Sequence, residues 1–313
     1  ISLRAGGNLT LDSQASLTTT STVDLVAGGN LLMSSGSGGG RTERSISAGS
    51  DVRLQAGGDV ALGAITATGQ NVAIIATGSI LDGDAGTDIT ASSVYLQAGS
   101  AIGSGTDVLE TDVSTLALSA GAGGAFVTET DALTIAAVTA AVNRMVTSSG
   151  PSSISGTWED LTTTGGGALV VQAGGLLTVN AGSAGTGVDA SGNVLLKTTS
   201  GNIALAAGLT SAGNVSLNAA GDVTQSADGD ITLTGSATTL DVLAGGNITM
   251  TAGAVSQTRQ GSVRYEASAG NIQLGQIDTT YSSSVGSSAV TLIASGSITD
   301  ADAIVIDPAG VIY

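Results

Sequence analysis

The feature that most constrains this chain is a short phrase repeated along it. Each copy has a turn residue, usually preceded by Gly, and then an apolar–small–apolar triplet. In the most regular stretch the turn residues are Asn193, Asn202, Asn214, Asp222, Asp230 and Asn247. Most copies lie 8 to 12 residues apart, and two copies make a unit of about 20 residues. A unit of this length cannot bury its own apolar face, so it must stack on its neighbours.

The pattern inside each phrase predicts a β-solenoid. In Val215-Ser216-Leu217 the side chains alternate between the faces of a strand, so Val215 and Leu217 point inward and Ser216 points outward. Gly adopts positive φ freely, and Asn and Asp bond to their own backbone, so we expect Gly-Asn and Gly-Asp to form corners. Corners this frequent do not suit sandwich strands joined by full loops. We therefore expect an all-β parallel β-helix with about 20 residues per coil.

Composition agrees with a narrow core, because the chain has 48 Gly, 2 Pro and 2% aromatic residues. A thin prism accepts stacked Val, Leu, Ile and Ala more readily than Trp or Phe, and Pro would remove a ladder donor. Two other repeat folds fit less well. The Leu-x-x-Leu-x-Leu frame of leucine-rich repeats is missing, and the nearest text to a calcium-binding nonapeptide, Ser37-Gly38-Gly39-Gly40, has no Asp.

The phrase also indicates how the chain is divided. We expect solenoid coils over 1–139, with a loop near 34–47, and further coils over 168–313. The repeated phrase is missing from residues 140–167, which lie between these coils and contain the only Trp, Trp158. We expect this segment to be an irregular loop or insertion. A solenoid without polar caps exposes strand edges, and neither end of this chain shows such a cap in its sequence. We therefore expect it to be part of a much longer polypeptide.

Charge and missing residue types narrow the function. The formal net charge is −17 and the sequence pI is about 4.1, which disfavours nucleic acid and anionic lipid as partners. The chain has no Cys and no His, so disulfide staples, thiol chemistry and the usual catalytic triads are excluded. Its apolar runs are too short to span a bilayer.

Several phrases carry a resemblance to a known family. Ala27-Gly28-Gly29-Asn30-Leu31, Ala56-Gly57-Gly58-Asp59-Val60 and Ala244-Gly245-Gly246-Asn247-Ile248-Thr249 resemble the filamentous-haemagglutinin-type repeats of giant bacterial surface proteins. The stretch from Leu116 to Leu133 is also similar to repeats of very large exoproteins of that kind. The resemblance implies a right-handed parallel β-helix, export from a Gram-negative-type cell, and a role in adhesion, biofilm matrix or surface fibres. It brings no catalytic residues to carry over.

Catalysis on a β-helix would need paired carboxylates or a basic residue in a groove with sugar-stacking aromatic residues. The spaced acid pairs are Asp82/Asp84, Asp228/Asp230 and Asp300/Asp302, and the only Lys is Lys197. One Trp, four Tyr and one Phe are few for lining a cleft. We expect these Asp residues to be solvated turn residues and the chain not to be an enzyme.

Two non-catalytic sites deserve a hypothesis. Asp82, Asp84 and Asp88 place three carboxylates in one Gly-containing turn, the oxygen ligands that Ca²⁺ prefers, although a plain Asp-Gly corner has the same composition. Loops on a rigid scaffold often carry binding residues, and Trp158, Arg41 and Arg44 are candidates for ligand contact. The alternatives are a Trp that covers the coils locally and two solvated Arg residues.

These observations favour a non-enzymatic structural segment, a rigid spacer or stalk of a secreted or cell-surface adhesin or extracellular fibre. The alternatives are a carbohydrate- or host-receptor-binding module that uses loops on the solenoid and a polysaccharide-degrading β-helix enzyme. We expect no cofactor, and a Ca²⁺ ion at the Asp82 turn is the alternative. The expected partners are other segments of the same long chain, other fibre copies, matrix polysaccharide or a host surface.

Overall fold

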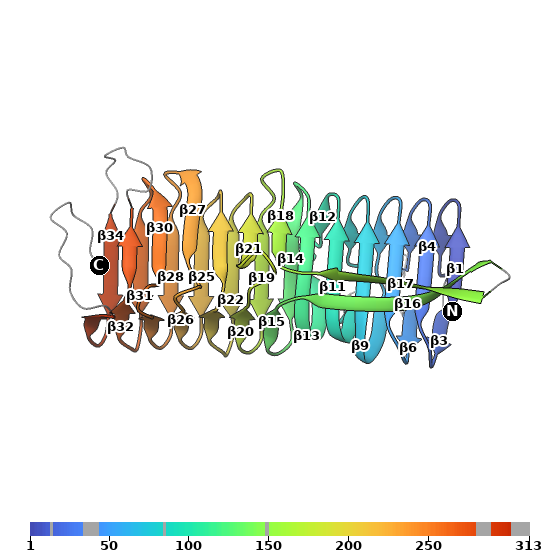
Figure 1. Cartoon of the computed structure of the whole chain (residues 1–313), viewed down its shortest axis with the longest axis horizontal. Coiled ribbons are helices and arrows are strands. Elements are labelled where there is room, and N and C mark those ends of the chain that lie inside the picture. The colour runs from blue at the N-terminus through green and yellow to red at the C-terminus, as the bar shows by residue number, and fades with distance from the viewer. Residues whose placement is uncertain (13–14, 34–43, 84–85, 148–149, 280–288, 302–313) are drawn as a thin grey trace. The chain divides into compact units, whose positions relative to one another are not determined.

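The computed structural model describes the chain except for residues 13–14, 34–43, 84–85, 148–149, 280–288 and 302–313. Its described residues form strands and no helix (Figure 1). Parallel strands stack as a β-solenoid of about 12 turns, which confirms the predicted fold class. The chain divides into two compact units, the first comprising Ile1–Thr130 with Ala137–Glu159 and the second Asp131–Ala136 with Asp160–Tyr313.

The first unit winds through three ladders of parallel strands. In the first ladder, the short strands are β1 (Ser2–Ala5), β4 (Val23–Ala27) and β7 (Val52–Ala56). Three long strands continue it and also serve the third ladder: β9 (Ala64–Ala76), β11 (Ile89–Ala98) and β13 (Leu109–Ala120). The second ladder contains β2 (Leu9–Thr10), β5 (Leu31–Leu32), β8 (Val60–Ala61), β10 (Ile80–Leu81), β12 (Ala101–Ile102) and β14 (Gly124–Glu129). The third begins with β3 (Ser16–Thr19) and β6 (Ser45–Ala48).

The second unit has the same build with shorter strands. Its first ladder contains β19 (Leu169–Ala173), β22 (Val194–Thr198), β25 (Val215–Ala219), β28 (Leu240–Ala244), β31 (Val263–Ala267) and β34 (Val290–Ala294). The second contains β15 (Leu133–Ile135), β20 (Leu177–Val179), β23 (Ile203–Leu205), β26 (Val223–Gln225), β29 (Ile248–Met250), β32 (Ile272–Leu274) and β35 (Ile298–Asp300). The third contains β18 (Leu161–Thr163), β21 (Thr186–Ala190), β24 (Gly208–Ser211), β27 (Ile231–Ser236), β30 (Val255–Arg259) and β33 (Gln276–Asp278).

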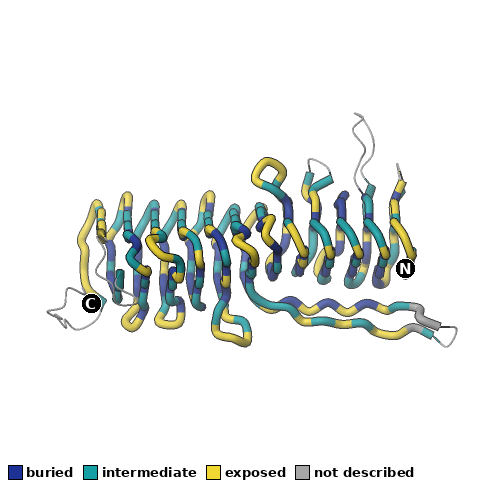
Figure 2. The backbone as a smooth tube through the Cα atoms, turned by 90° about the horizontal axis from the view of Figure 1, so that it is seen from above, coloured by how far each residue is buried: buried dark blue, intermediate teal, exposed yellow. Residues whose placement is uncertain are grey.

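Inward-pointing aliphatic side chains of successive coils form one dry axis in each unit. Val215 and Ile231 are each 1% exposed, and Leu217 is fully buried. Leu217 lies in parallel register with Leu196 on one side and Val242 on the other. Along many coil strands of the second unit, buried positions alternate with intermediate ones (Figure 2), as a strand with one face inward requires. The expected apolar axis is therefore confirmed.

Successive turns are about 23 residues apart, rather than the 20 expected from the regular stretch. Asp24 pairs with Arg53, whereas Arg53 pairs with Ala73, so neighbouring coils of one ladder differ in length. The strand residues stay in register although the connections between the strands differ in length. Lengthening such a connection costs little free energy.

The axis also accommodates an aromatic residue, although we expected a core too narrow for large rings. Tyr265 is 1% exposed and lies opposite Val242 in the ladder. Its hydroxyl lies 2.6 Å from Ser256 Oγ, which is 3.1 Å from Gln225 Oε1. Burial raises the pKa of Tyr265. The small Ser256 leaves space for the ring, and the buried polar chain satisfies its own hydrogen bonds.

Where we expected an irregular loop or insertion at 140–167, the chain forms an antiparallel hairpin of β16 (Val138–Thr147) and β17 (Gly150–Trp158). Val138, Ala140 and Val142 are buried and alternate with exposed residues, which is the period of a strand with one covered face. Within the first unit the hairpin crosses the coil strands, and β16 packs against β4, β7 and β9 (Figure 1).

The Gly-Asn and Gly-Asp corners work differently from our expectation. The corner Gly residues do not adopt positive φ; the described positive-φ Gly residues lie elsewhere. A Cβ atom on Gly58 would overlap the Asn30 side-chain oxygen of the preceding coil, and one on Gly246 would overlap that of Asp222. These two corners therefore require Gly because a side chain from the neighbouring coil occupies the space, whereas at Gly201 and Gly229 the backbone of the neighbouring coil occupies it.

Those corner side chains form hydrogen-bonded ladders. Asn193 Oδ1 accepts from the backbone N–H of Asn214 at 2.9 Å, and Asn214 Oδ1 accepts from that of Thr239 at 2.9 Å. In the neighbouring ladder, which includes Asn202, Asp222 Oδ1 accepts from the backbone N–H of Asn247 at 2.6 Å. Asp230 Oδ1 accepts from Val255 at 2.8 Å. Each of these corners thus supplies an acceptor for a backbone N–H that has no partner in the strand ladders.

We expect Asn214→Leu to destabilise the second unit by about 0.5–1.5 kcal/mol, because the N–H of Thr239 loses its acceptor. Asn214→Asp is the matched control, since Asp222 performs the same role with a carboxylate oxygen. Thermal unfolding measures both variants. An unchanged midpoint in Asn214→Leu would contradict the role assigned to the ladder.

Candidate functional site

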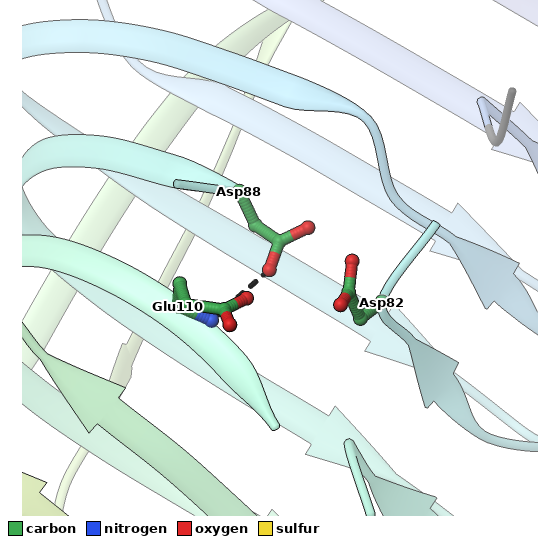
Figure 3. Close-up of side chains that lie close together, drawn as sticks. All are labelled: Asp82, Asp88 and Glu110. Atoms are coloured by element: carbon green, nitrogen blue, oxygen red, sulfur yellow. Dashed lines mark hydrogen bonds between the residues drawn. The ribbon is translucent and has the colours of Figure 1, made fainter. Parts of the chain in front are cut away.

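An acidic cluster joins Asp82, Asp88 and Glu110 in the first unit (Figure 3). One carboxylate oxygen from each lies within 4.8 Å of the others. Asp88 is fully buried, whereas Asp82 and Glu110 are partly exposed. Asp88 Oδ2 accepts from the backbone N–H of Glu110 at 3.0 Å, and the backbone N–H of Asp88 donates to the carbonyl of Glu110 at 3.0 Å. The ladder between β11 and β13 therefore brings Asp88 and Glu110 together, and Asp82 directly follows β10.

The cluster raises the pKa of Glu110 above its ordinary value. Burial of the carboxyl is the main cause, and the negative charges of Asp82 and Asp107 add to it. A carboxylate in these surroundings favours protonation because its charged form is poorly solvated and faces like charges. A hard divalent cation bound by the three carboxylates would relieve the same repulsion.

We expect Glu110→Gln to raise the thermal midpoint at pH values above the raised pKa of Glu110, where the wild-type carboxylate carries its charge. The folded state holds this proton more tightly than the unfolded state, so wild-type stability should rise as pH falls from the raised pKa toward the ordinary value of 4.5. The advantage of Glu110→Gln should shrink over that interval. A pH series of midpoints measures this, with the exposed Asp228→Asn as control, and an equal advantage at every pH would contradict it.

The sequence-based calcium hypothesis named Asp82, Asp84 and Asp88. Asp84 lies outside the described residues, and Glu110 is a member that we did not foresee. Its place one coil after Asp88 is the signal that could have revealed it, because the two residues are separated by one turn of the ladder. Calcium binding stays a prediction, which isothermal titration of Ca²⁺ into wild type and Glu110→Gln can test.

Trp158 lies against the coils of the first unit. Its ring stacks on Tyr95 with centroids 4.5 Å apart and an interplanar angle of 6°. Together with Ile75, it packs on a buried cluster that includes Ala73, Tyr95 and Val138. Burial raises the pKa of Tyr95 to about 12, and its hydroxyl donates to Gln97 Oε1 at 3.1 Å. One face of the Trp158 ring is thus used in packing, and ligand contact by Trp158 stays a prediction.

A buried ion triad holds the other part of the hairpin. Asp24 is fully buried, and its carboxylate accepts from Arg53 Nε at 3.0 Å and from Arg144 Nε at 2.7 Å. Arg53 comes from the next coil and Arg144 from β16. The backbone N–H groups of Ala141 and Asn143 also donate to Asp51 Oδ2 and Thr22 Oγ1 at 2.8 and 3.2 Å. The hairpin is therefore bonded to two successive coils.

The remaining predicted residues lie apart from these contacts. Arg41, Asp302 and the greater part of the predicted 34–47 loop fall outside the described residues. Arg44 is half-buried directly before β6. Asp228 and Asp300 are exposed, and Lys197 lies half-buried on β22.

A groove of about 470 Å³ lies on the second unit over β29, β32 and β35. Thr249, Gln273 and Thr299 occupy one register row along it. Asn247, Asn271 and Ser297, which belong to a corner ladder, line its side. The side chains that line the groove are amides, hydroxyls and one aliphatic group, Ile248, so its hydrogen-bonding groups are uncharged.

No protein-family model, curated protein or solved structure matches this chain. In the part of the chain that the structure describes, no helix is long and apolar enough to cross a membrane. Function must therefore be argued from the geometry.

Proposed function

We propose that this chain is a structural segment of a secreted or cell-surface adhesin or extracellular fibre, of the filamentous-haemagglutinin-like kind. It serves as a rigid spacer or stalk and performs no catalysis. The observation that carries this proposal is the stacking of inward side chains residue over residue. In the first unit, a column of fully buried residues in parallel register comprises Leu25, Leu54, Ile74, Leu96 and Leu118.

Such a stack is stiff for a physical reason. Each coil is hydrogen-bonded to the next along its strands, and its core side chains are packed at the density of a solid. Bending would break strand hydrogen bonds and separate packed side chains on the same side of the stack at the same time. A segment of this kind can hold a binding tip, or neighbouring segments of the same chain, at a fixed distance from the cell.

A comparison with a flexible linker tests the spacer. Labels on β19 and β34, at the two ends of one ladder of the second unit, should give a narrow distance distribution. A Gly/Ser chain of equal length should give the broad distribution of a random coil. Pulsed electron spin resonance on spin labels measures both. Equally broad distributions would contradict the proposal.

The second candidate is a carbohydrate-binding module, which the uncharged groove over β29, β32 and β35 favours. Amide and hydroxyl side chains such as Gln273, Thr249 and Thr299 suit a neutral, hydroxyl-rich ligand such as matrix polysaccharide or a host glycan. A glycan array with wild type, Trp158→Ala and Gln273→Ala separates the candidates. The spacer predicts no binding by any of them, and the module predicts binding that Gln273→Ala alone reduces. Turnover in a screen of acidic polysaccharides would favour an enzyme instead.

A further inference from the structure

The β16–β17 hairpin has two edges, one bonded to the coils and one on the outside. The register puts Ala141 opposite Ser155 and Asn143 opposite Ser153. The N–H groups of Ala141 and Asn143 donate to side chains of the coils, so they point away from β17. In an antiparallel ladder, opposite residues either both exchange hydrogen bonds or both point away from each other. The backbone N–H and C=O groups of Ser153 and Ser155 therefore lie on the outer edge of β17.

The same alternation places Thr157 on that edge. Ser153, Ser155 and Thr157 are all exposed. Figure 2 shows the two tubes of the hairpin beside the coils, with the tube that carries buried residues nearer to them. That strand is β16, which is also the strand that packs on β4, β7 and β9. The coils thus cap one edge of the hairpin, while the edge of β17 faces outward.

The central part of this edge, residues 152–158, has none of the sequence features that protect an edge from pairing. Exposed edges are usually blunted by charged residues, Pro or a bulge. Residues 152–158 contain no charged residue and no Pro. Pro151 lies near the start of β17 and Glu159 directly follows its end, so they limit the open edge to this central part. The register irregularity of the hairpin lies between Met145 and Thr147 instead. The whole chain carries a formal net charge of −17. An uncharged edge is where two such chains approach each other with least repulsion.

The edge is also self-complementary. About a two-fold axis at Ser155, Ser155 would lie opposite Ser155 of a second copy, and Ser153 opposite Thr157 of the second copy. Small hydroxyl side chains form favourable cross-strand pairs, and the hairpin already contains one, Thr139 with Thr157 at 2.8 Å between Oγ1 atoms. An antiparallel arrangement sends Glu159 of the two copies to opposite ends, whereas a parallel one would set them side by side.

We propose that the outer edge of β17 pairs antiparallel with the same edge of a second copy of this chain, about a two-fold axis at Ser155. The two hairpins then form one four-stranded sheet. This deepens the proposed function by giving the fibre segment a lateral link to another copy, although the pairing itself does not depend on the spacer role. A two-stranded hairpin is marginal alone, so the added strands also stabilise it.

A single cysteine tests the register, because the chain has none of its own. In Ser155→Cys, two-fold pairing brings the Cα atoms of the two cysteines to about 5.5 Å, within the range for a disulfide. Ser152→Cys is the matched control, since Ser152 is exposed on the same strand but lies far from its counterpart across the axis. Under mild oxidation we expect Ser155→Cys to form the covalent dimer at least about tenfold faster. Equal or faster cross-linking of Ser152→Cys would overturn the proposal.

Sedimentation velocity tests the pairing without a cross-link. Wild type should shift from monomer to dimer as concentration rises, and Ser155→Pro should stay monomeric because it removes an outward N–H. Ser155→Ala retains that N–H and should still dimerise, and equal thermal midpoints of the variants would show that the hairpin still folds. A wild type that is monomeric at every concentration would overturn the inference and leave the spacer proposal standing. A broad distance distribution between the spin labels would contradict the spacer proposal and leave the pairing of the β17 edges standing.

Discussion

Asp24→Asn is expected to lower the free energy of unfolding of the first unit by about 3–5 kcal/mol, because it leaves two buried guanidinium groups without their shared counter-charge. Asp24 is fully buried, and the side chains of Arg53 and Arg144 are only 10% and 12% exposed. Replacing the carboxylate by an amide keeps the shape and removes the charge. Guanidinium denaturation measures the loss, and hydrogen exchange of β16 shows whether the hairpin detaches before the coils unfold.

The second unit supplies the matched control. Arg264 binds Asp241 across neighbouring coils with two hydrogen bonds of 2.9 Å, but these side chains are 42% and 39% exposed. Arg264 also pairs with Glu266. Asp241→Asn should therefore cost no more than about 1 kcal/mol. Equal losses for Asp24→Asn and Asp241→Asn would contradict the claim that cover by the hairpin makes the Asp24 contacts strong.

Leu217→Ala is expected to destabilise the second unit by about 2–5 kcal/mol, because it removes buried methyl groups and leaves a cavity in the axis. Leu217 is fully buried and lies between Leu196 and Val242 in the ladder. The stacked coils restrict collapse around the cavity, since each neighbouring side chain is held by its own register. Thermal and chemical unfolding measure the loss.

Ser216→Ala is the control for Leu217→Ala, because Ser216 is the neighbouring outward residue of the same strand. Its substitution should change stability by no more than about 0.5 kcal/mol. If both variants lose the same stability, the axis is not the main source of it.

Much of the solenoid could be predicted because its information is local and repeated. In each phrase, such as Asn214-Val215-Ser216-Leu217, the alternation of apolar and polar residues predicts which side chains point inward and which outward. Because similar units stack on one another, the same pattern also predicts which strands pair. The corner Gly residues were recognised by position but for the wrong reason. Gly58 and Gly246 are needed because a side chain of the preceding coil approaches them, and such a contact appears only once the coils are stacked.

The candidate sites depend on contacts that cross coils. Glu110 joins Asp88 only through the register of β11 and β13, and residues 84–85 leave part of the expected calcium turn undescribed. The hairpin was less predictable still. Its strand alternation over Val138–Val142 is short, and the surface that buries it comes from coils more than a hundred residues earlier, such as Asp24 with Arg144.

By itself, the sequence determined the parallel coils, the aliphatic axis and the corner positions, because period and polarity repeat in every turn. Only the tertiary structure decided that 138–158 lies as a hairpin over the first unit, that Asp24 is buried there, and that one edge of β17 faces outward. The physical reason is that these features arise from packing between segments distant in the chain, and the local sequence of one segment does not indicate which other segment it contacts.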